Sequence, residues 1–332
     1  MKIFSIKLFL LVSLIAFTNI NEAISAPQAS QVLSSAWEAP VGLQQIPIWP
    51  SDTLKHVSKN QGFETTQRMT PPAVKPGREY TQILNVSTPT LTVFPPKGKN
   101  TGASIIVFPG GGFRIIAIDL EGSEICDWIT TRGVTCILLK YRVPGGNHYW
   151  DKGCKCHITP KAPFALHDAQ RTIKLVRSRA NELKIDPNKV GVIGFSAGGY
   201  LVAQTSNIAQ SDYEPVDEID KLSSRPNFAI ALYPGHLCRK GRTFDPTTKV
   251  TSQAPPTFLL QAWDDPVDNI CNSTLYAKAL SEAGVPTEVH LFAKGGHAFG
   301  LRSQNQPISA WPSLVEKWLE EIEILPPYPK AL

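Results

Sequence analysis

The sequence has no basic run and, beyond its first 26 residues, no apolar stretch long enough to cross a bilayer. Its 33 Lys and Arg residues outnumber its 28 Asp and Glu residues by only five charges, spread over 332 positions. Clustered positive charge indicates nucleic-acid binding, and a membrane-spanning helix needs about 20 apolar residues. We therefore expect neither a nucleic-acid partner nor a stable membrane anchor. The hydrophobic content of 42% is typical of a globular core.

The motifs of several cofactor-dependent classes are also missing. The cysteines nowhere have C-x-x-C spacing, so the C-x-C of Cys154 and Cys156 does not indicate a structural zinc site. The glycine run at residues 110–112 does not continue as G-x-G-x-x-G, which excludes the dinucleotide fingerprint. Cleavage of a glycosidic bond usually needs two flanking carboxylates, and no such pair can be identified. The sequence predicts no metal and no cofactor.

The first 25 residues have the pattern of a cleaved signal peptide. Lys2 and Lys7 provide the positive start, Leu8–Phe17 forms a short apolar core, and the small residues Ser25 and Ala26 follow. That core is too short to span a bilayer. We therefore expect the mature protein to be secreted or periplasmic.

Export would allow the six cysteines to form disulfides, but the sequence does not assign their pairing. Cys126 and Cys136 lie in apolar surroundings, which fits buried thiols as well as a bridge. Cys154 and Cys156 lie in a polar loop, which is expected to be tied by a disulfide.

Residues 26–79 are rich in Pro, Gln, Thr and Ser, and we expect them to form an arm over the domain at 80–332. In that domain, short β-branched or aromatic segments alternate with helical patterns. The predicted helices cover Leu166–Leu183, Asn272–Ala283 and about Ser309–Glu323. The predicted strands are Thr81–Val86, Thr90–Phe94, Ser104–Phe108, Thr135–Lys140, Val190–Phe195, Phe228–Tyr233, Thr257–Ala262 and Glu288–Phe292. The alternation predicts an α/β fold, a mostly parallel, doubly wound sheet with helices on both faces.

One short motif is typical of a nucleophile: Gly194-Phe-Ser-Ala-Gly-Gly199 lies between a predicted strand and a helix-compatible segment. A sharp strand-to-helix turn would raise the Ser196 hydroxyl, and a Cβ at Gly194 or Gly198 would crowd that turn. Taken alone, the motif also fits a serine that merely caps a helix.

A serine needs a base and a group that orients the base, and both follow later in the chain. His297, after Gly295-Gly296, is the predicted base, and Asp265 is the predicted acid between the serine and the histidine. Asp264 and Asp268 are alternatives for the acid. The alternative without a catalytic role is an ordinary surface histidine at His297 and a solvated acidic turn at the aspartates.

Backbone amides for an oxyanion are predicted at two places. The run Pro109-Gly-Gly-Gly-Phe113 follows an early strand, so Gly111 and Gly112 are candidate donors together with Ala197, directly after the nucleophile. A flexible glycine turn is the alternative. The ordered set of glycine loop, serine, acid and histidine predicts a serine hydrolase.

These residues resemble the α/β-hydrolase superfamily, and specifically its acetylxylan and feruloyl esterase-like branch. The matching stretches are Phe108–Phe113, Tyr141–Pro144, Asp168–Arg171, Asp186–Val190, Gly194–Gly199, Asp264–Val267 and Gly295–Gly300. Many lipases and esterases have a histidine before the glycine run, where this chain has Phe108-Pro109. Similar proteins are sometimes labelled xylanases. The resemblance implies an exported serine carboxylesterase that cleaves short-chain, acetyl-type esters of carbohydrates.

The resemblance also bears on residues outside the triad. Asp168 and Arg171 match structural positions, and we expect a buried ion pair or capping element there.

Candidate substrate contacts are Phe113, Tyr149, Trp150 and His236. Aromatic rings at Tyr149 and Trp150 would stack on sugar rings, whereas a turn histidine is the simpler explanation of His236.

Two other functions share parts of this pattern. A prolyl-oligopeptidase-like peptidase has the same triad order, but the chain has too few upstream residues for the usual propeller. A non-catalytic binding protein on a hydrolase scaffold would not need an intact triad. The expected partner is a small-molecule or polysaccharide ester, and the sequence does not give the oligomeric state.

Overall fold

We describe a computed structural model of the 332-residue chain. The described residues are 32–33, 36–53, 62–69, 79–143, 150–151, 156–157, 162–208, 210–211, 213–302 and 305–327. The signal peptide predicted at residues 1–25 lies outside these ranges.

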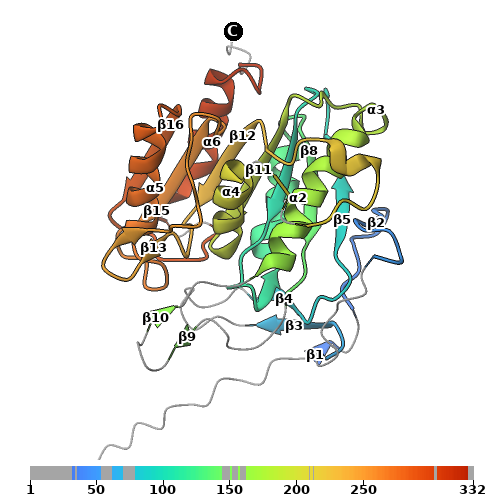
Figure 1. The fold of residues 1–332 in the computed structure, drawn as a ribbon, viewed down its shortest axis with the longest axis horizontal. Helices are drawn as coiled ribbons and strands as arrows, with labels where there is room; N and C mark the ends of the chain where they lie inside the picture. The colour runs from blue at the N-terminus through green and yellow to red at the C-terminus, as the bar shows by residue number, and fades with distance from the viewer. Residues whose placement is uncertain are drawn as a thin grey trace, which may run out of the picture.

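An eight-stranded central sheet organises the molecule (Figure 1). Its strand order is β16-β15-β12-β11-β6-β8-β5-β2. The strands are β2 (Gln45–Pro47), β5 (Thr90–Phe94), β6 (Ser104–Phe108), β8 (Thr135–Lys140), β11 (Val190–Phe195), β12 (Phe228–Leu232), β15 (Thr257–Ala262) and β16 (Thr287–Phe292). The six strands from β16 to β8 in this order are parallel, and β5 and β2 are antiparallel. The prediction of a mostly parallel sheet is confirmed.

Helices cover both faces of this sheet, which explains why β6, β8, β11, β12 and β15 are mostly apolar and are buried along their whole length. The helices are α1 (Glu124–Thr130), α2 (Pro163–Ser178), α3 (Ala180–Leu183), α4 (Ala197–Asn207), α5 (Cys271–Glu282) and α6 (Trp311–Glu321), with short turns at η1 (Asp119–Ser123), η2 (Glu218–Lys221) and η3 (Pro307–Ala310). Helices α1 and α6 lie together, because Trp128 Nε1 donates to Glu316 Oε1 at 2.8 Å. On the other face α2 packs beside α4, and Asn207 of α4 donates to the Tyr276 hydroxyl of α5.

The register of the sheet brings five loops to one edge. Phe108 at the end of β6 pairs with Gly194 of β11, and Phe195 pairs with Leu232 at the end of β12. Farther along the sheet, β12, β15 and β16 run parallel and end at the same edge. Ligand sites in open α/β sheets form at this carboxyl edge, so the loops after these strands are the place to look for a site.

A smaller antiparallel sheet lies beside the central one, with strand order β1-β3-β4-β7. Its strands are β1 (Val32–Leu33), β3 (Thr65–Met69), β4 (Tyr80–Leu84) and β7 (Ile115–Ala117). The strand expected at Thr81–Val86 therefore exists, but it belongs to this sheet. Two pairs of two-residue strands complete the set: β9 (Trp150–Asp151) with β10 (Cys156–His157), and β13 (Cys238–Arg239) with β14 (Thr243–Phe244).

The described parts of the predicted arm pack against the domain. Strand β2 extends the central sheet beyond β5, and Ile48 and Trp49 behind it are buried. The Trp49 indole donates to Asp168 Oδ1 of α2 at 2.6 Å. The boundary of the arm at residue 79 stays a prediction.

Asp168 and Arg171 of α2, expected to form a buried ion pair or capping element, are buried charged residues. Both side chains are buried, but they do not pair with each other. Asp168 accepts from Arg142 at 2.7 Å, and the Arg171 guanidinium binds Asp217 at 2.5 Å. Each residue therefore anchors a separate segment to α2.

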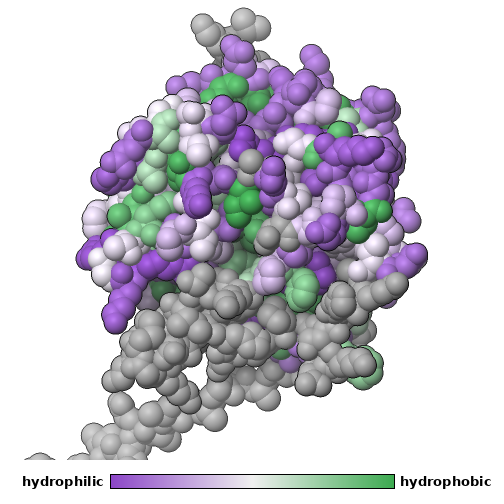
Figure 2. All heavy atoms as spheres, viewed as in Figure 1, coloured by the Kyte–Doolittle hydropathy of each residue, from purple (hydrophilic) through white to green (hydrophobic). Residues whose placement is uncertain are grey.

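Two disulfides are described. Cys126–Cys136 joins α1 to β8, so these residues form a bridge and are not free thiols. Cys238–Cys271 joins β13 to the first residue of α5. The face in Figure 2 carries hydrophilic side chains with smaller hydrophobic areas between them. Within the described ranges, none of the helices combines the length and the apolarity that crossing a membrane requires.

Candidate active site

Ser196 stands on the sharp turn between β11 and α4. Its backbone has φ 52° and ψ −117°, an unusual conformation for a residue with a side chain. A Cβ on Gly194 would collide with the Gly198 carbonyl, and one on Gly198 would collide with the Phe108 carbonyl. The prediction that both glycines are needed at this turn is confirmed.

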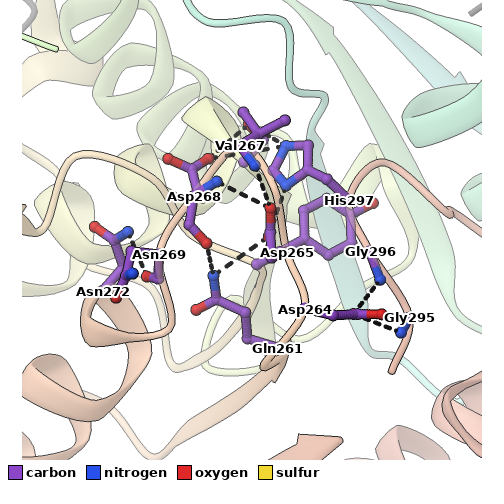
Figure 3. Close-up of polar contacts among 12 residues, drawn as sticks. Gln261, Asp264, Asp265, Val267, Asp268, Asn269, Asn272, Gly295, Gly296 and His297 are labelled. Carbon is purple, nitrogen blue, oxygen red and sulfur yellow. Dashed lines mark hydrogen bonds and ion pairs between the residues drawn. The ribbon is translucent and has the colours of Figure 1, made fainter. Parts of the chain in front are cut away.

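His297 is hydrogen bonded on both ring nitrogens (Figure 3). Its Nε2 lies 3.0 Å from Ser196 Oγ, and its Nδ1 lies 2.8 Å from Asp265 Oδ2. The Asp265 side chain is fully buried, and the His297 side chain is 10% exposed. A carboxylate on Nδ1 favours the tautomer with hydrogen on that nitrogen, so Nε2 can accept the serine proton.

The two adjacent aspartates bind different groups. Asp265 Oδ1 accepts the backbone N–H groups of Val267 and Asp268, which directs Oδ2 at His297. Asp264 Oδ1 accepts the N–H groups of Gly295 and Gly296 instead. Asp264 therefore holds the loop that carries His297, whereas Asp265 binds the imidazole itself.

The charges around His297 favour its protonated form. Burial acts to lower the pKa of His297, but the hydrogen bond to Asp265 and the charges of Asp268 and Glu121 together hold that pKa above its ordinary value. The carboxylates around His297 would therefore stabilise a protonated imidazole at this position.

The glycine loop after β6 lies directly against the serine. A Cβ on Gly110 would stand 3.0 Å from Ser196 Cβ. A buried hydrogen bond holds the start of this loop, because the Tyr141 hydroxyl donates to the Pro109 carbonyl at 2.6 Å. The Gly110 N–H donates to Glu121 Oε2 at 2.8 Å, so the candidate oxyanion donors of this loop are Gly111 and Gly112.

Glu121 and Tyr233 lie buried behind the site, and no sequence motif points to either residue. Glu121 is 2% exposed and accepts from the Tyr233 hydroxyl at 2.9 Å. The Tyr233 ring meets the His297 ring edge to face, with centroids 4.8 Å apart. Burial raises the pKa of Glu121, and burial with the neighbouring Glu121 raises that of Tyr233. These residues are 112 positions apart, which is why local patterns do not reveal the contact.

The carboxylate of Asp268 lies beside Ser196, in addition to that of Asp265, which binds His297. Ser196 Oγ lies 3.3 Å from Asp268 Oδ2, and His297 Nε2 lies 3.8 Å from the same oxygen. From the sequence alone, Asp268 is only an alternative candidate for the triad acid. Its position next to Asp265-Pro266-Val267 was the one signal that could have identified it.

The four expected substrate contacts have different outcomes. Phe113 is fully buried and packs against Tyr141, Tyr200 and His236, so the expectation that it contacts substrate is corrected. Its ring supports the glycine loop from within the core. His236 is half-buried on the loop after β12 and stays a candidate. Tyr149 lies outside the described residues, and Trp150 is described only as part of β9.

No metal-ligating group of three or more His, Cys, Asp or Glu side chains occurs in the described part of the chain.

Comparison with known proteins agrees with the fold. A family model for the alpha/beta hydrolase fold matches residues 158–253. The chain is 28% identical over 225 residues to an acetylxylan esterase of Xylanibacter ruminicola, covering 60% of this chain and 42% of that protein. It is 26% identical over 235 residues to endo-1,4-beta-xylanase B of Butyrivibrio fibrisolvens, covering 62% and 34%. The chain thus spans less than half the length of these two relatives.

A solved structure covers more of the molecule. The acetyl ester-xyloside bifunctional hydrolase from Caldicellulosiruptor lactoaceticus is 31% identical, with a TM-score of 0.65. The match covers 85% of this chain and 97% of that chain. The chain belongs to the α/β-hydrolase family, as this similarity, the mostly parallel sheet and the serine on a strand-to-helix turn together show.

Proposed function

We propose that the chain is a carboxylic ester hydrolase that acts through an acyl-enzyme on Ser196. The observation that carries the proposal is the hydrogen-bonded series from Ser196 Oγ through both nitrogens of His297 to Asp265. A buried acid, a base and a serine on a strand-to-helix turn are suited to acyl transfer when they are hydrogen bonded in this order. The names of the similar proteins agree, because they include an acetylxylan esterase and an acetyl ester-xyloside hydrolase.

The acylation step follows from the geometry. Ser196 Oγ forms a bond to the ester carbonyl carbon while its proton passes to His297 Nε2. The carbonyl oxygen becomes an oxyanion, which the N–H groups of Gly111, Gly112 and Ala197 stabilise. His297 then gives its proton to the leaving alcohol oxygen as the carbon–oxygen bond breaks, which leaves the acyl group on Ser196.

Deacylation repeats these roles with water. His297 Nε2 takes a proton from water, whose oxygen bonds to the acyl carbon. The bond to Ser196 Oγ breaks, the serine recovers its proton from His297, and a carboxylic acid leaves. Asp265 is paired with the imidazolium in both steps and does not itself need to be protonated.

For the substrate, we propose short-chain esters, acetyl above all, of carbohydrate alcohols. One of the similar proteins is named an acetylxylan esterase, and another is named an acetyl ester-xyloside bifunctional hydrolase. The name of a third is a xylanase, yet the hydrogen-bonded series at Ser196 provides for acyl transfer, and we assign no glycosidic cleavage to it.

We also propose that the protein is exported after removal of residues 1–25. The sequence pattern of that segment is the main support. The two described disulfides support it too, because such bonds persist in oxidising compartments. N-terminal sequencing of the mature protein would test the cleavage site.

Ser196→Ala tests the assigned nucleophile. We expect a loss in kcat of about 10⁶-fold with an unchanged fold, because both chemical steps pass through this oxygen. The assay is hydrolysis of p-nitrophenyl acetate, with circular dichroism to check the fold. Ser178→Ala, a serine of α2 bonded to the Leu175 carbonyl, is the control and should keep its activity.

A substrate panel separates the ester classes. It contains p-nitrophenyl acetate, butyrate and octanoate, acetylated xylan, methyl ferulate and p-nitrophenyl xyloside. We expect acetyl esters to be turned over fastest, and a fluorophosphonate to label Ser196. Faster cleavage of octanoate with no acetate released from any sugar would exclude the proposed substrate, and retained activity in Ser196→Ala would exclude the mechanism.

A further inference from the structure

A triad requires only one carboxylate, which is Asp265 here, yet Asp268 places a second one beside Ser196. Its Oδ2 forms a triangle with Ser196 Oγ at 3.3 Å and His297 Nε2 at 3.8 Å, around the 3.0 Å hydrogen bond between those two atoms. Its side chain is 14% exposed, whereas that of Asp265 is fully buried. Of the two, Asp268 is the carboxylate that solvent and a ligand can reach.

The surroundings hold Asp268 in this position. Its backbone N–H donates to Asp265 Oδ1 at 2.9 Å, and its carbonyl accepts from Gln261 Nε2 at 2.6 Å (Figure 3). The carboxylate itself occupies the space beside Gly235, where a Cβ would stand 2.9 Å from both of its oxygens. The triad acid therefore fixes the backbone of Asp268, and a glycine makes room for its side chain.

This placement has an electrostatic cost. A tetrahedral intermediate adds negative charge near Ser196, and a carboxylate close by opposes that charge. The imidazolium formed in the same step offsets part of the repulsion. A group of the substrate that donates a hydrogen bond to Asp268 would offset more of it, because hydrogen bonds to charged groups are the stronger ones.

The leaving alcohol is the part of the substrate that brings such a donor. Its oxygen must receive the proton from His297 Nε2, so it lies on the side of Ser196 that Asp268 Oδ2 also faces. When the next carbon of that alcohol carries a hydroxyl, the two oxygens are within hydrogen-bonding distance of each other. That hydroxyl is then placed to reach the Asp268 carboxylate.

We propose that Asp268 determines specificity by accepting a hydrogen bond from a hydroxyl on the carbon next to the ester oxygen. The preferred substrates are thus monoesters of vicinal diols, the arrangement that a partly acylated sugar presents. An alcohol with a carboxylate at the same place is disfavoured, because two anions would face each other. The proposal rests on the proposed ester hydrolysis and names the class of alcohol.

A pair of small acetates tests this without the other features of a sugar. 2-Hydroxyethyl acetate has the vicinal hydroxyl, and 2-methoxyethyl acetate has an ether that cannot donate. In the wild type we expect kcat/KM to be about tenfold or more higher for the hydroxy ester, the usual effect of one hydrogen bond to a charged group. The ratio should fall to about one in Asp268→Ala and take a middle value in Asp268→Asn, whose amide oxygen accepts more weakly.

The ratio cancels any change in the basicity of His297, because both esters use the same base. Asp264→Asn removes the neighbouring carboxylate and should leave the ratio unchanged, whatever happens to the rate. Acetoxyacetate, which has a carboxylate in place of the hydroxyl, should be a poor substrate that improves in Asp268→Asn.

The outcomes distinguish this proposal from the general function. If the wild type hydrolyses neither acetate, the proposed ester hydrolysis is wrong. If it hydrolyses both equally well, or if Asp268→Ala keeps the preference, ester hydrolysis stands and the role of Asp268 is wrong. Should Asp268→Ala fail to fold, the wild-type ratio and Asp268→Asn still decide the question.

Discussion

Asp264 and Asp265, two consecutive aspartates in the loop after β15, bind different groups. Asp265 binds the imidazole of His297, and Asp264 binds the two amides that precede it. Successive side chains of the loop point to different neighbours, so adjacent residues of the same type reach the ring and the backbone of one segment. The sequence cannot separate the two by type, but substitution can.

Asp265→Asn should lower kcat by about 10⁴-fold, because an amide on Nδ1 favours the wrong imidazole tautomer. Asp264→Asn should have a much smaller effect, because its amide oxygen can still accept from Gly295 and Gly296. Steady-state kinetics with p-nitrophenyl acetate measures both variants. A larger loss in Asp264→Asn than in Asp265→Asn would contradict the assignment of the acid.

The pH dependence is a second prediction at this scale. His297 must be neutral to accept the serine proton, so kcat/KM should fall as the pH drops through its pKa. Burial acts against protonation, but Asp265, Asp268 and Glu121 together raise this pKa. The acid limb of the kcat/KM profile should therefore have its midpoint above about pH 6.5, the ordinary value for histidine. A midpoint below that value would show that burial prevails.

At the scale of elements, the site depends on a buried connection between η1, the glycine loop and the end of β12. Glu121 of η1 accepts from the Gly110 N–H and from the Tyr233 hydroxyl. The Tyr233 hydroxyl also accepts the Gly300 N–H at 3.4 Å, beyond His297. The Glu121 carboxylate thus holds both the glycine loop after β6 and the Tyr233 ring that packs on His297.

Glu121→Gln should disturb this connection, because two donors face the side chain and an amide has only one oxygen. We expect a loss of about 1–3 kcal/mol in the free energy of unfolding and a lower kcat. Glu124→Gln is the matched control on the next helix, where the partly exposed pair with Arg302 contributes less. Urea unfolding and steady-state kinetics measure the two variants. Equal effects of both would contradict the special role of Glu121.

At the scale of the whole molecule, the disulfide Cys238–Cys271 closes a loop that contains β15 and the segment after it. Asp265 and Asp268 both lie within the 33-residue separation that it closes. The bond joins β13 to α5, and the Asn272 side chain of α5 also accepts the N–H groups of Leu237 and Cys238. The end of the acid loop at α5 is therefore tied to the segment that follows β12.

Replacing Cys238 and Cys271 together by serine should lower the free energy of unfolding by about 3–4 kcal/mol, as closing a loop of this length implies. Urea unfolding of the oxidised protein measures the change. Reducing the wild type should produce a loss in the same direction, whereas an unchanged midpoint in both experiments would contradict the stabilising role of the bond.

Much of this molecule could be predicted from short stretches of its sequence. The central strands are mostly apolar runs of five or six residues, and a sheet covered on both faces requires such runs. The turn at Ser196 was also predictable, because a Cβ on Gly194 would collide with Gly198 only four residues later. A Cβ on Gly198 would collide with Phe108 of the adjacent strand β6. The spacing after β15 predicted Asp265 as the acid, with Asp264 and Asp268 as alternatives, and the structure places Asp265 at the histidine.

Other features were decided only by the tertiary structure. Glu121 meets Tyr233 across 112 positions, and Ser196 meets Asp268 across 72. Strand β4 joins a separate sheet, and Phe113 is buried behind its loop. The physical reason is the same in each case. A local pattern specifies a turn or a strand, whereas the partner of a side chain depends on which strands lie side by side, and strand order is set by packing of the whole domain.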